Sequence, residues 1–70
     1  MDIGTILYER RNAKGLSQEE LAFKVGVSRQ SIYKWENNIS IPNIYNFMEL
    51  MRVLKIDLYV INNDIKIVFK

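Results

Sequence analysis

The sequence predicts a mainly α-helical fold that ends in a β-hairpin. Two observations support this: apolar residues recur at helical spacing over residues 3–54, and they alternate at strand spacing over residues 56–69. The 70 residues contain no Gly/Ser-rich or charge-rich stretch that could act as a linker. We therefore expect one domain over residues 1–70, with a helical part at 1–55 and a hairpin at 56–70.

Local signals mark the ends of the first two helices. The first helix should end near Gly15, which can take the left-handed conformation of a C-cap. Ser17 and Glu20 fit a capping box at the beginning of the second helix. Gly26 is placed to reverse the chain, and Ser28 is the next candidate N-cap. The expected apolar positions of these two helices are Ile3, Ile6, Leu7, Leu21, Ala22 and Val25.

The third and fourth helices follow from the same kind of signal. The third should run from Arg29 to about Asn37, and Asn38 is suited to the left-handed conformation that ends a helix. Asn43, directly after Pro42, is the expected cap of the fourth helix. The apolar face predicted for that helix consists of Ile44, Phe47, Leu50, Met51 and Leu54.

The second and third helices, joined by a short turn containing Gly26, form a helix-turn-helix, whose second helix can be presented to the DNA major groove. At about 100° per residue, Ile32 and Trp35 point to the core. The opposite side is polar and consists of Arg29, Gln30, Tyr33, Lys34 and Asn37. Arg and Lys suit guanine and Gln suits adenine, so this side has the chemistry of base readout. On composition alone, a merely solvated helix face remains the alternative.

Composition excludes several kinds of site. Without Cys or His there is no disulfide, no thiolate or His metal site and no Ser-His-Asp triad. The eight carboxylates form no catalytic pair and no phosphate-binding glycine loop occurs, so we expect no enzyme, no cofactor and no metal. The net charge of +2 permits an anionic partner. Because no apolar run is long enough to span a membrane and no signal peptide begins the chain, we expect a cytoplasmic protein without a membrane partner.

The motif pattern extends over most of the chain. Leu-Ser-Gln-Glu-Glu-Leu-Ala at 16–22, Gly-Val-Ser-Arg-Gln-Ser-Ile at 26–32 and Trp-Glu-Asn-Asn at 35–38 are followed by Pro42. Over roughly residues 3–56 this closely resembles the Xre/Cro-type family of bacterial and phage DNA-binding domains related to lambda repressor. The resemblance implies a lambda-repressor-like four-helix domain that binds double-stranded DNA as a sequence-specific transcriptional regulator. A homodimeric repressor is the expected form.

The resemblance also implies roles for particular residues. Gln18 matches a residue that bonds a DNA phosphate, although simple solvation of a first helical turn is the alternative. Arg29, Gln30 and Lys34 match positions that contact bases. Tyr33 and Asn37 flank them, toward the bases or the DNA backbone. The full set of candidate DNA contacts is Gln18, Ser28, Arg29, Gln30, Ser31, Tyr33, Lys34 and Asn37.

Three further residues are expected to be structural. Arg11 and Glu36 match a partly buried salt bridge between the first helix and the end of the third, and Trp35 is a core anchor. The chain departs from the family pattern after the Trp-Glu-Asn run at 35–37, because Asn38 and Ile39 replace the usual Gly and Lys or Arg. Ile39 cannot neutralise a phosphate, so the resemblance does not support a contact with the DNA backbone at this position.

The last segment is rich in β-branched and aromatic residues and is broken at Asn62-Asn63-Asp64, which predicts a hairpin. A two-residue loop could be Asn62-Asn63 or Asn63-Asp64, whereas a three-residue loop would oppose Val60 to Lys66. With either two-residue loop, one face would carry Leu58, Val60, Ile65, Ile67 and Phe69. The other would carry Asp57, Tyr59, Ile61, Lys66, Val68 and Lys70.

An isolated hairpin is marginally stable in water, so this one must pack on the helices, on a second copy, or on both. We expect it to build a homodimer through Leu58, Tyr59, Ile61, Ile67 and Val68. The alternative is a hairpin that only caps its own helices. Its placement is similar to that in antitoxin-type members of the family, so an antitoxin that binds a toxin partner and its own operator is the second functional hypothesis.

Overall fold

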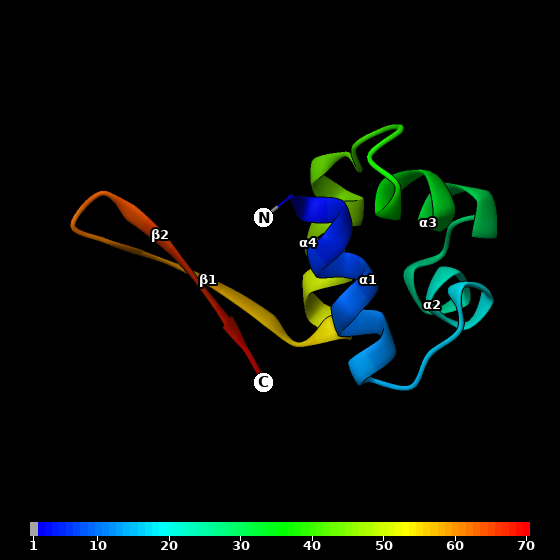
Figure 1. Cartoon of the computed structure of the whole chain (residues 1–70), viewed down its shortest axis with the longest axis horizontal. Helices are drawn as coiled ribbons and strands as arrows, with labels where there is room; N and C mark the ends of the chain where they lie inside the picture. Colours follow the sequence, from blue (N-terminus) through cyan, green and yellow to red (C-terminus); the bar gives the residue numbers. More distant parts are fainter. Residues whose placement is uncertain (1) are drawn as a thin grey trace.

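The computed structural model describes residues 2–70, except for the side chains of Val60 and Ile61. Four helices are formed within this range: α1 (Ile3–Ala13), α2 (Gln18–Val25), α3 (Arg29–Glu36) and α4 (Ile44–Leu54). The strands β1 (Ile56–Ile61) and β2 (Asp64–Phe69) follow them. The helices pack into one body, and the two strands extend from it as a ribbon (Figure 1). The predicted fold class, a mainly helical domain with a C-terminal hairpin, is confirmed.

Side-chain caps fix where the helices begin. The capping box of α2 is complete, because the Glu20 N–H donates to Ser17 Oγ at 3.0 Å and the Ser17 N–H donates to Glu20 Oε1 at 2.9 Å. These bonds favour the charged carboxylate and lower the pKa of Glu20 below its ordinary value. Ser28 caps α3 and Asn43 caps α4 through the same type of bond. Asp2 caps α1, a contact for which the sequence reasoning gave no expectation.

The core lies between the four helices and the first residue of the hairpin. Leu21, Ile32, Leu50 and Leu54 are almost completely buried, and Ile56 joins them from β1. Ile44 differs from the prediction, because 64% of it is exposed. It lies about 120° around α4 from Leu50, at the rim of the apolar stripe, where the packed helices no longer cover it.

Two positions with positive φ set the geometry around α3. Gly26 has φ 86° and reverses the chain between α2 and α3, and Asn38 has φ 58° just after α3. The Asn38 side chain accepts a hydrogen bond from the Gly4 N–H at 3.2 Å. Gly4 lies so close to the end of α3 that a Cβ atom there would be 2.5 Å from the Glu36 carbonyl oxygen. The N-terminus of α1 is therefore fixed against the end of α3.

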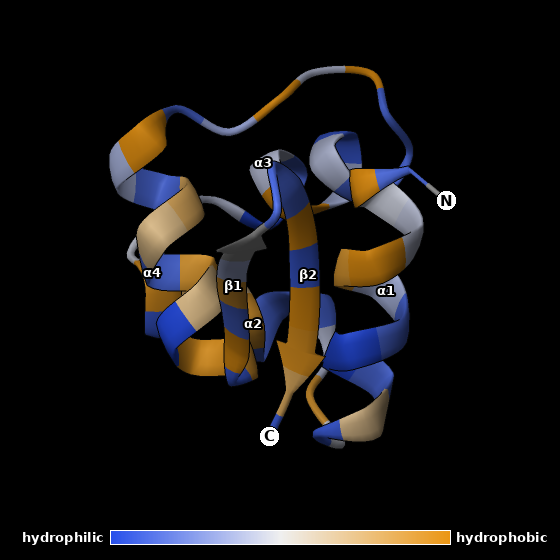
Figure 2. Ribbon diagram, turned by 90° about the vertical axis from the view of Figure 1, so that its left-hand side faces the viewer, coloured by the Kyte–Doolittle hydropathy of each residue, from blue (hydrophilic) through white to orange (hydrophobic). Residues whose placement is uncertain are grey.

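The hairpin closes through Asn62 and Asn63, whose φ angles of 52° and 66° suit a tight two-residue turn. Ile61 pairs with Asp64 in the backbone register, which selects the first of the two possible loops and excludes the three-residue one. Hydrophilic and hydrophobic residues alternate over the first half of β2, whereas its last three residues, 67–69, are all hydrophobic (Figure 2). Leu58, opposite Ile67 in the register, shares the inner face with it.

The hairpin contacts the helices mainly at its base. Arg10 of α1 donates to the carbonyl oxygens of Leu54 and Lys70, at 3.4 and 3.0 Å, and its guanidinium lies 4.6 Å from the centre of the Phe69 ring. Farther out, an apolar cavity of about 110 Å³ separates Leu58 and Ile67 from α1 and α4. Both side chains remain about two-fifths exposed, at 42% and 43%. The inner face of the hairpin therefore covers the helices only in part.

Candidate nucleic-acid interface

Helix α3 has two chemically different sides. Ile32 and Trp35 are buried in the core, with 1% and 6% exposure. The opposite side carries only exposed residues: Arg29, Gln30, Tyr33, Lys34 and Asn37. Because the buried side fixes the helix to the core, these side chains project from a rigid support into solvent.

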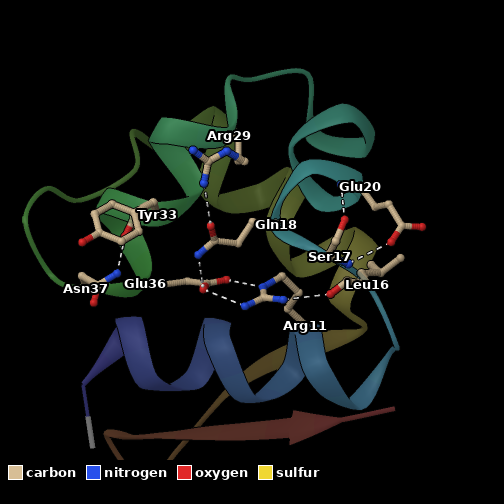
Figure 3. A network of polar contacts seen from close by, with 9 residues as sticks. All are labelled: Arg11, Leu16, Ser17, Gln18, Glu20, Arg29, Tyr33, Glu36 and Asn37. Atoms are coloured by element: carbon tan, nitrogen blue, oxygen red, sulfur yellow. Dashed lines mark hydrogen bonds and ion pairs between the residues drawn. The ribbon is translucent and has the colours of Figure 1, made fainter.

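A buried ion pair lies below this helix (Figure 3). Arg11 donates from Nε to Glu36 Oε2 at 2.6 Å and from Nη2 to Oε1 at 3.0 Å. The two side chains are only 9% and 2% exposed. Arg11 also donates to the Leu16 carbonyl oxygen at 2.9 Å, and its bonds to Glu36 raise its pKa above the ordinary arginine value. The pair thus joins α1 to the last turn of α3.

Gln18 extends this network to the exposed side of α3. Its Nε2 donates to Glu36 Oε1 at 3.1 Å, while its Oε1 accepts from Arg29 Nη1 at 3.3 Å. Because a carboxylate can only accept, Glu36 fixes the orientation of the Gln18 carboxamide, and the oxygen faces Arg29. Figure 3 shows the resulting chain from Arg11 through Glu36 and Gln18 to Arg29. Arg29 is therefore held at one end of the exposed side.

The remaining candidate residues fall into two groups. Ser28, Ser31 and Asn37 are engaged locally: Ser28 Oγ accepts from the Ser31 N–H at 3.2 Å, and Asn37 Nδ2 donates to the Tyr33 carbonyl oxygen at 2.8 Å. That bond turns the Asn37 Oδ1 acceptor away from the helix end. Gln30 and Lys34 are exposed and take part in no side-chain hydrogen bond among the described residues. Their donors are available to a ligand.

A hollow of about 300 Å³ adjoins the last turn of α3. Thr5 and Tyr8 of α1 line it together with Gln18, Glu36 and Asn37. The sequence reasoning missed Thr5 and Tyr8, although their spacing places them on the same side of α1 as the pairing arginine. Their hydroxyl groups add possible hydrogen-bond donors beside the exposed side of α3.

Other kinds of site receive no support. Within residues 2–70, no group of three His, Cys, Asp or Glu side chains is placed to hold a metal ion. None of the helices described above is long and apolar enough to cross a lipid bilayer. Ile39, at the position where the family pattern has a basic residue, is 62% exposed in the loop after α3. The polar side of α3 and its surroundings are therefore the candidate site.

Comparison with known proteins agrees with this geometry. A family model described as helix-turn-helix matches residues 7–61. A protein of Methanocaldococcus jannaschii named "Putative HTH-type transcriptional regulatory protein MJ1164" is 39% identical over 62 residues. The match covers 80% of this chain but only 20% of that protein, so the chain spans about a fifth of the length of this curated relative. The chain belongs to the Xre/Cro-like helix-turn-helix family of DNA-binding transcriptional regulators.

Proposed function

We propose that this chain is a sequence-specific transcriptional repressor that binds its operator as a homodimer and catalyses no reaction. The observation that carries the proposal is the two-sided α3, which is anchored by Ile32 and Trp35 and exposes a row of polar side chains. A helix of this kind fits the major groove, where donor and acceptor patterns distinguish all four base pairs. Such a repressor would act by occupying its operator.

Different residues of this site contact the bases and the phosphates of the DNA. Arg29, Gln30 and Lys34 read base edges, with Arg and Lys suited to guanine and Gln to adenine. Gln18 lies at the first position of α2, where free backbone N–H groups favour a phosphate. Since its side-chain oxygen faces Arg29, Gln18 would bind phosphate through that backbone or through its second Nε2 hydrogen. The hydroxyl of Tyr8 supplies a further donor to the DNA backbone.

A homodimer is supported by the hairpin. Leu58, Tyr59, Ile67 and Val68 are 41–48% exposed, which leaves apolar surface for a second copy, while the Ile61 side chain lies outside the described residues. Two-fold symmetry would place two recognition helices about 34 Å apart, one turn of DNA, and would require a palindromic operator.

The test is selection of bound sequences from random duplex DNA, followed by alanine variants on the selected site. Arg29→Ala and Gln30→Ala should each cost about 1–3 kcal/mol and relax the preference at one or two base pairs. Lys66→Ala, which removes an exposed cation from the hairpin, is the control and should preserve the base preference. Equal losses on selected and random DNA for Arg29→Ala would show a phosphate contact and contradict base readout.

The second candidate is an antitoxin that binds a toxin protein as well as its own operator. It is favoured by apolar exposure on both faces of the hairpin, at Tyr59 and Val68 as well as at Leu58 and Ile67. A stable complex with a different protein on purification would support this candidate. A salt-sensitive complex with DNA and no other protein would support the repressor alone.

A further inference from the structure

The outer edge of β2 is open for pairing. Within residues 2–70 the sheet consists of β1 and β2 alone. The Lys70 N–H donates to the Lys55 carbonyl oxygen at 2.8 Å. The backbone N–H and C=O groups of Lys70 therefore point toward the β1 side of the hairpin. Backbone direction alternates along an antiparallel strand, and the N–H and C=O groups of Ile65, Ile67 and Phe69 therefore point away from β1. These groups need partners from another chain or from water.

The surroundings of this edge leave room for a strand. The hairpin projects from the helical body, and β2 lies on the side of α1 while β1 lies on the side of α4 (Figures 1 and 2). The contact between α1 and β2 is concentrated at the base, where Arg10 reaches Phe69 and Lys70. Along the rest of β2, Ile65 and Ile67 are 68% and 43% exposed. A strand added here would lie in the plane of the sheet, with its side chains beside those of β2.

Side-chain charge selects one register for two identical β2 strands. A two-fold axis at Ile67 pairs the whole of residues 64–70, setting Asp64 against Lys70 of the second copy and Ile65 against Phe69 of the second copy. An axis at Lys66 or Val68 places lysine directly against lysine, which is unfavourable. An axis at Ile65 pairs only residues 63–67. Opposite charges therefore face each other in strands paired over their full length only when the two-fold axis lies at Ile67.

The edge of β1 offers no register in which two identical strands would pair opposite charges. Asp57 is the one charged residue of β1, so two antiparallel β1 strands cannot form opposite-charge pairs. Asp57 is already paired with Lys70 in its own hairpin, and that contact raises the pKa of Lys70. In the Ile67-centred pairing, Lys70 would lie between this carboxylate and Asp64 of the second copy.

We propose that a second copy of this chain pairs along the free edge of β2, with the two-fold axis at Ile67, to form a continuous four-stranded antiparallel sheet. The inference rests on the proposed homodimer and specifies its strand, register and charge pairs. It is independent of base readout by α3. A dimer of this kind satisfies the open backbone groups and covers Ile65 and Phe69 in the same step.

Single cysteines test the register, because the chain contains no other cysteine. Across the axis, two Ile67→Cys residues would have Cα atoms about 5.5 Å apart, within the range for a disulfide. Leu58→Cys is the matched control, since Leu58 lies opposite Ile67 on the same face with nearly equal exposure. Its two copies would be about 14 Å apart, three strand spacings, and could not join.

Mild oxidation of the full chain should therefore give a covalent dimer for Ile67→Cys and none for Leu58→Cys. Cross-linking of Leu58→Cys, or of both variants equally, would overturn the β2 register. A wild-type chain that remains monomeric in sedimentation at high concentration would overturn both this inference and the homodimer. A dimer in which Ile67→Cys fails to join would overturn the register and leave the homodimer standing. Operator binding, measured separately, decides the DNA function.

Charge reversal gives an independent readout without changing apolar packing. Asp64→Lys and Lys70→Asp each replace two attractive pairs across the axis by two repulsive ones, and each should weaken dimerisation about tenfold. Lys70→Asp also removes the ion pair with Asp57 of its own hairpin, so Asp64→Lys is the cleaner single variant. Combining them restores opposite charges across the axis and should recover most of the dimer affinity. Lys66→Asp, opposite Val68 in this register, should have a much smaller effect. Failure of the double variant to recover would contradict the Asp64–Lys70 pairing.

Discussion

Replacing Glu36 with alanine removes the acceptor of the buried network. Arg11 would keep its charge at a site where 9% of its side chain is exposed. Three donors would lose their acceptor: Nε and Nη2 of Arg11 and Nε2 of Gln18. An uncompensated buried charge costs about 3 kcal/mol, at the lower end of the range for breaking such pairs. A chain of this size has a total stability of only about 5 kcal/mol, so most of the margin would be lost.

Urea unfolding followed by circular dichroism measures this effect. With a slope of about 1 kcal/mol per molar urea for a small domain, a loss of about 3 kcal/mol should lower the midpoint by about 3 M. Glu49→Ala is the control, because Glu49 and Arg52 form an exposed pair and its loss should barely change the midpoint. An Arg11→Met and Glu36→Leu double variant should be more stable than Glu36→Ala. A Glu36→Ala chain with the parental midpoint would refute the reasoning.

Two further predictions concern the helix ends. Gly4→Ala should destabilise the fold, because the added Cβ would lie 2.5 Å from the Glu36 carbonyl oxygen and 2.8 Å from Asn38 Oδ1. Thermal melting checks this, and an unchanged melting temperature would contradict the close packing of α1 on α3. Because the pKa of Glu20 is lowered in the folded chain, the ionised side chain stabilises the fold. This stabilisation is complete above the ordinary glutamate pKa and is lost as the pH falls through the pKa of the folded state. Glu20→Gln should remove that part of the acid dependence, which a comparison of stability at pH 7 and pH 3 would detect.

Features controlled by neighbouring residues were predictable from the sequence. The capping box at Ser17, the caps at Ser28 and Asn43 and the left-handed Asn38 all depend on chemistry within a few residues. The loop of the hairpin was predicted only to within three choices, a three-residue loop and two two-residue loops, because Asn62, Asn63 and Asp64 are all suitable turn residues.

Features that depend on tertiary geometry were not predictable in this way. Lys55 takes a left-handed conformation with φ 57°, which directs the hairpin away from the helices, although lysine carries no signal for it. The contact between Gln18 and Arg29 requires α2 and α3 to be placed first. The chemistry of the exposed side of α3 followed from helical spacing, but the network that holds Arg29 did not.

The separation of the two sides of α3 has a consequence for how binding preference can change. Ile32, Trp35 and Glu36 are committed to the core, and each constrains its neighbours. Gln30 and Lys34 face solvent, so exchanging them alters the exposed chemistry of the helix while the packed interior stays intact. Under the proposed function, single substitutions at these two positions would therefore change the operator preference while every intermediate sequence still folds.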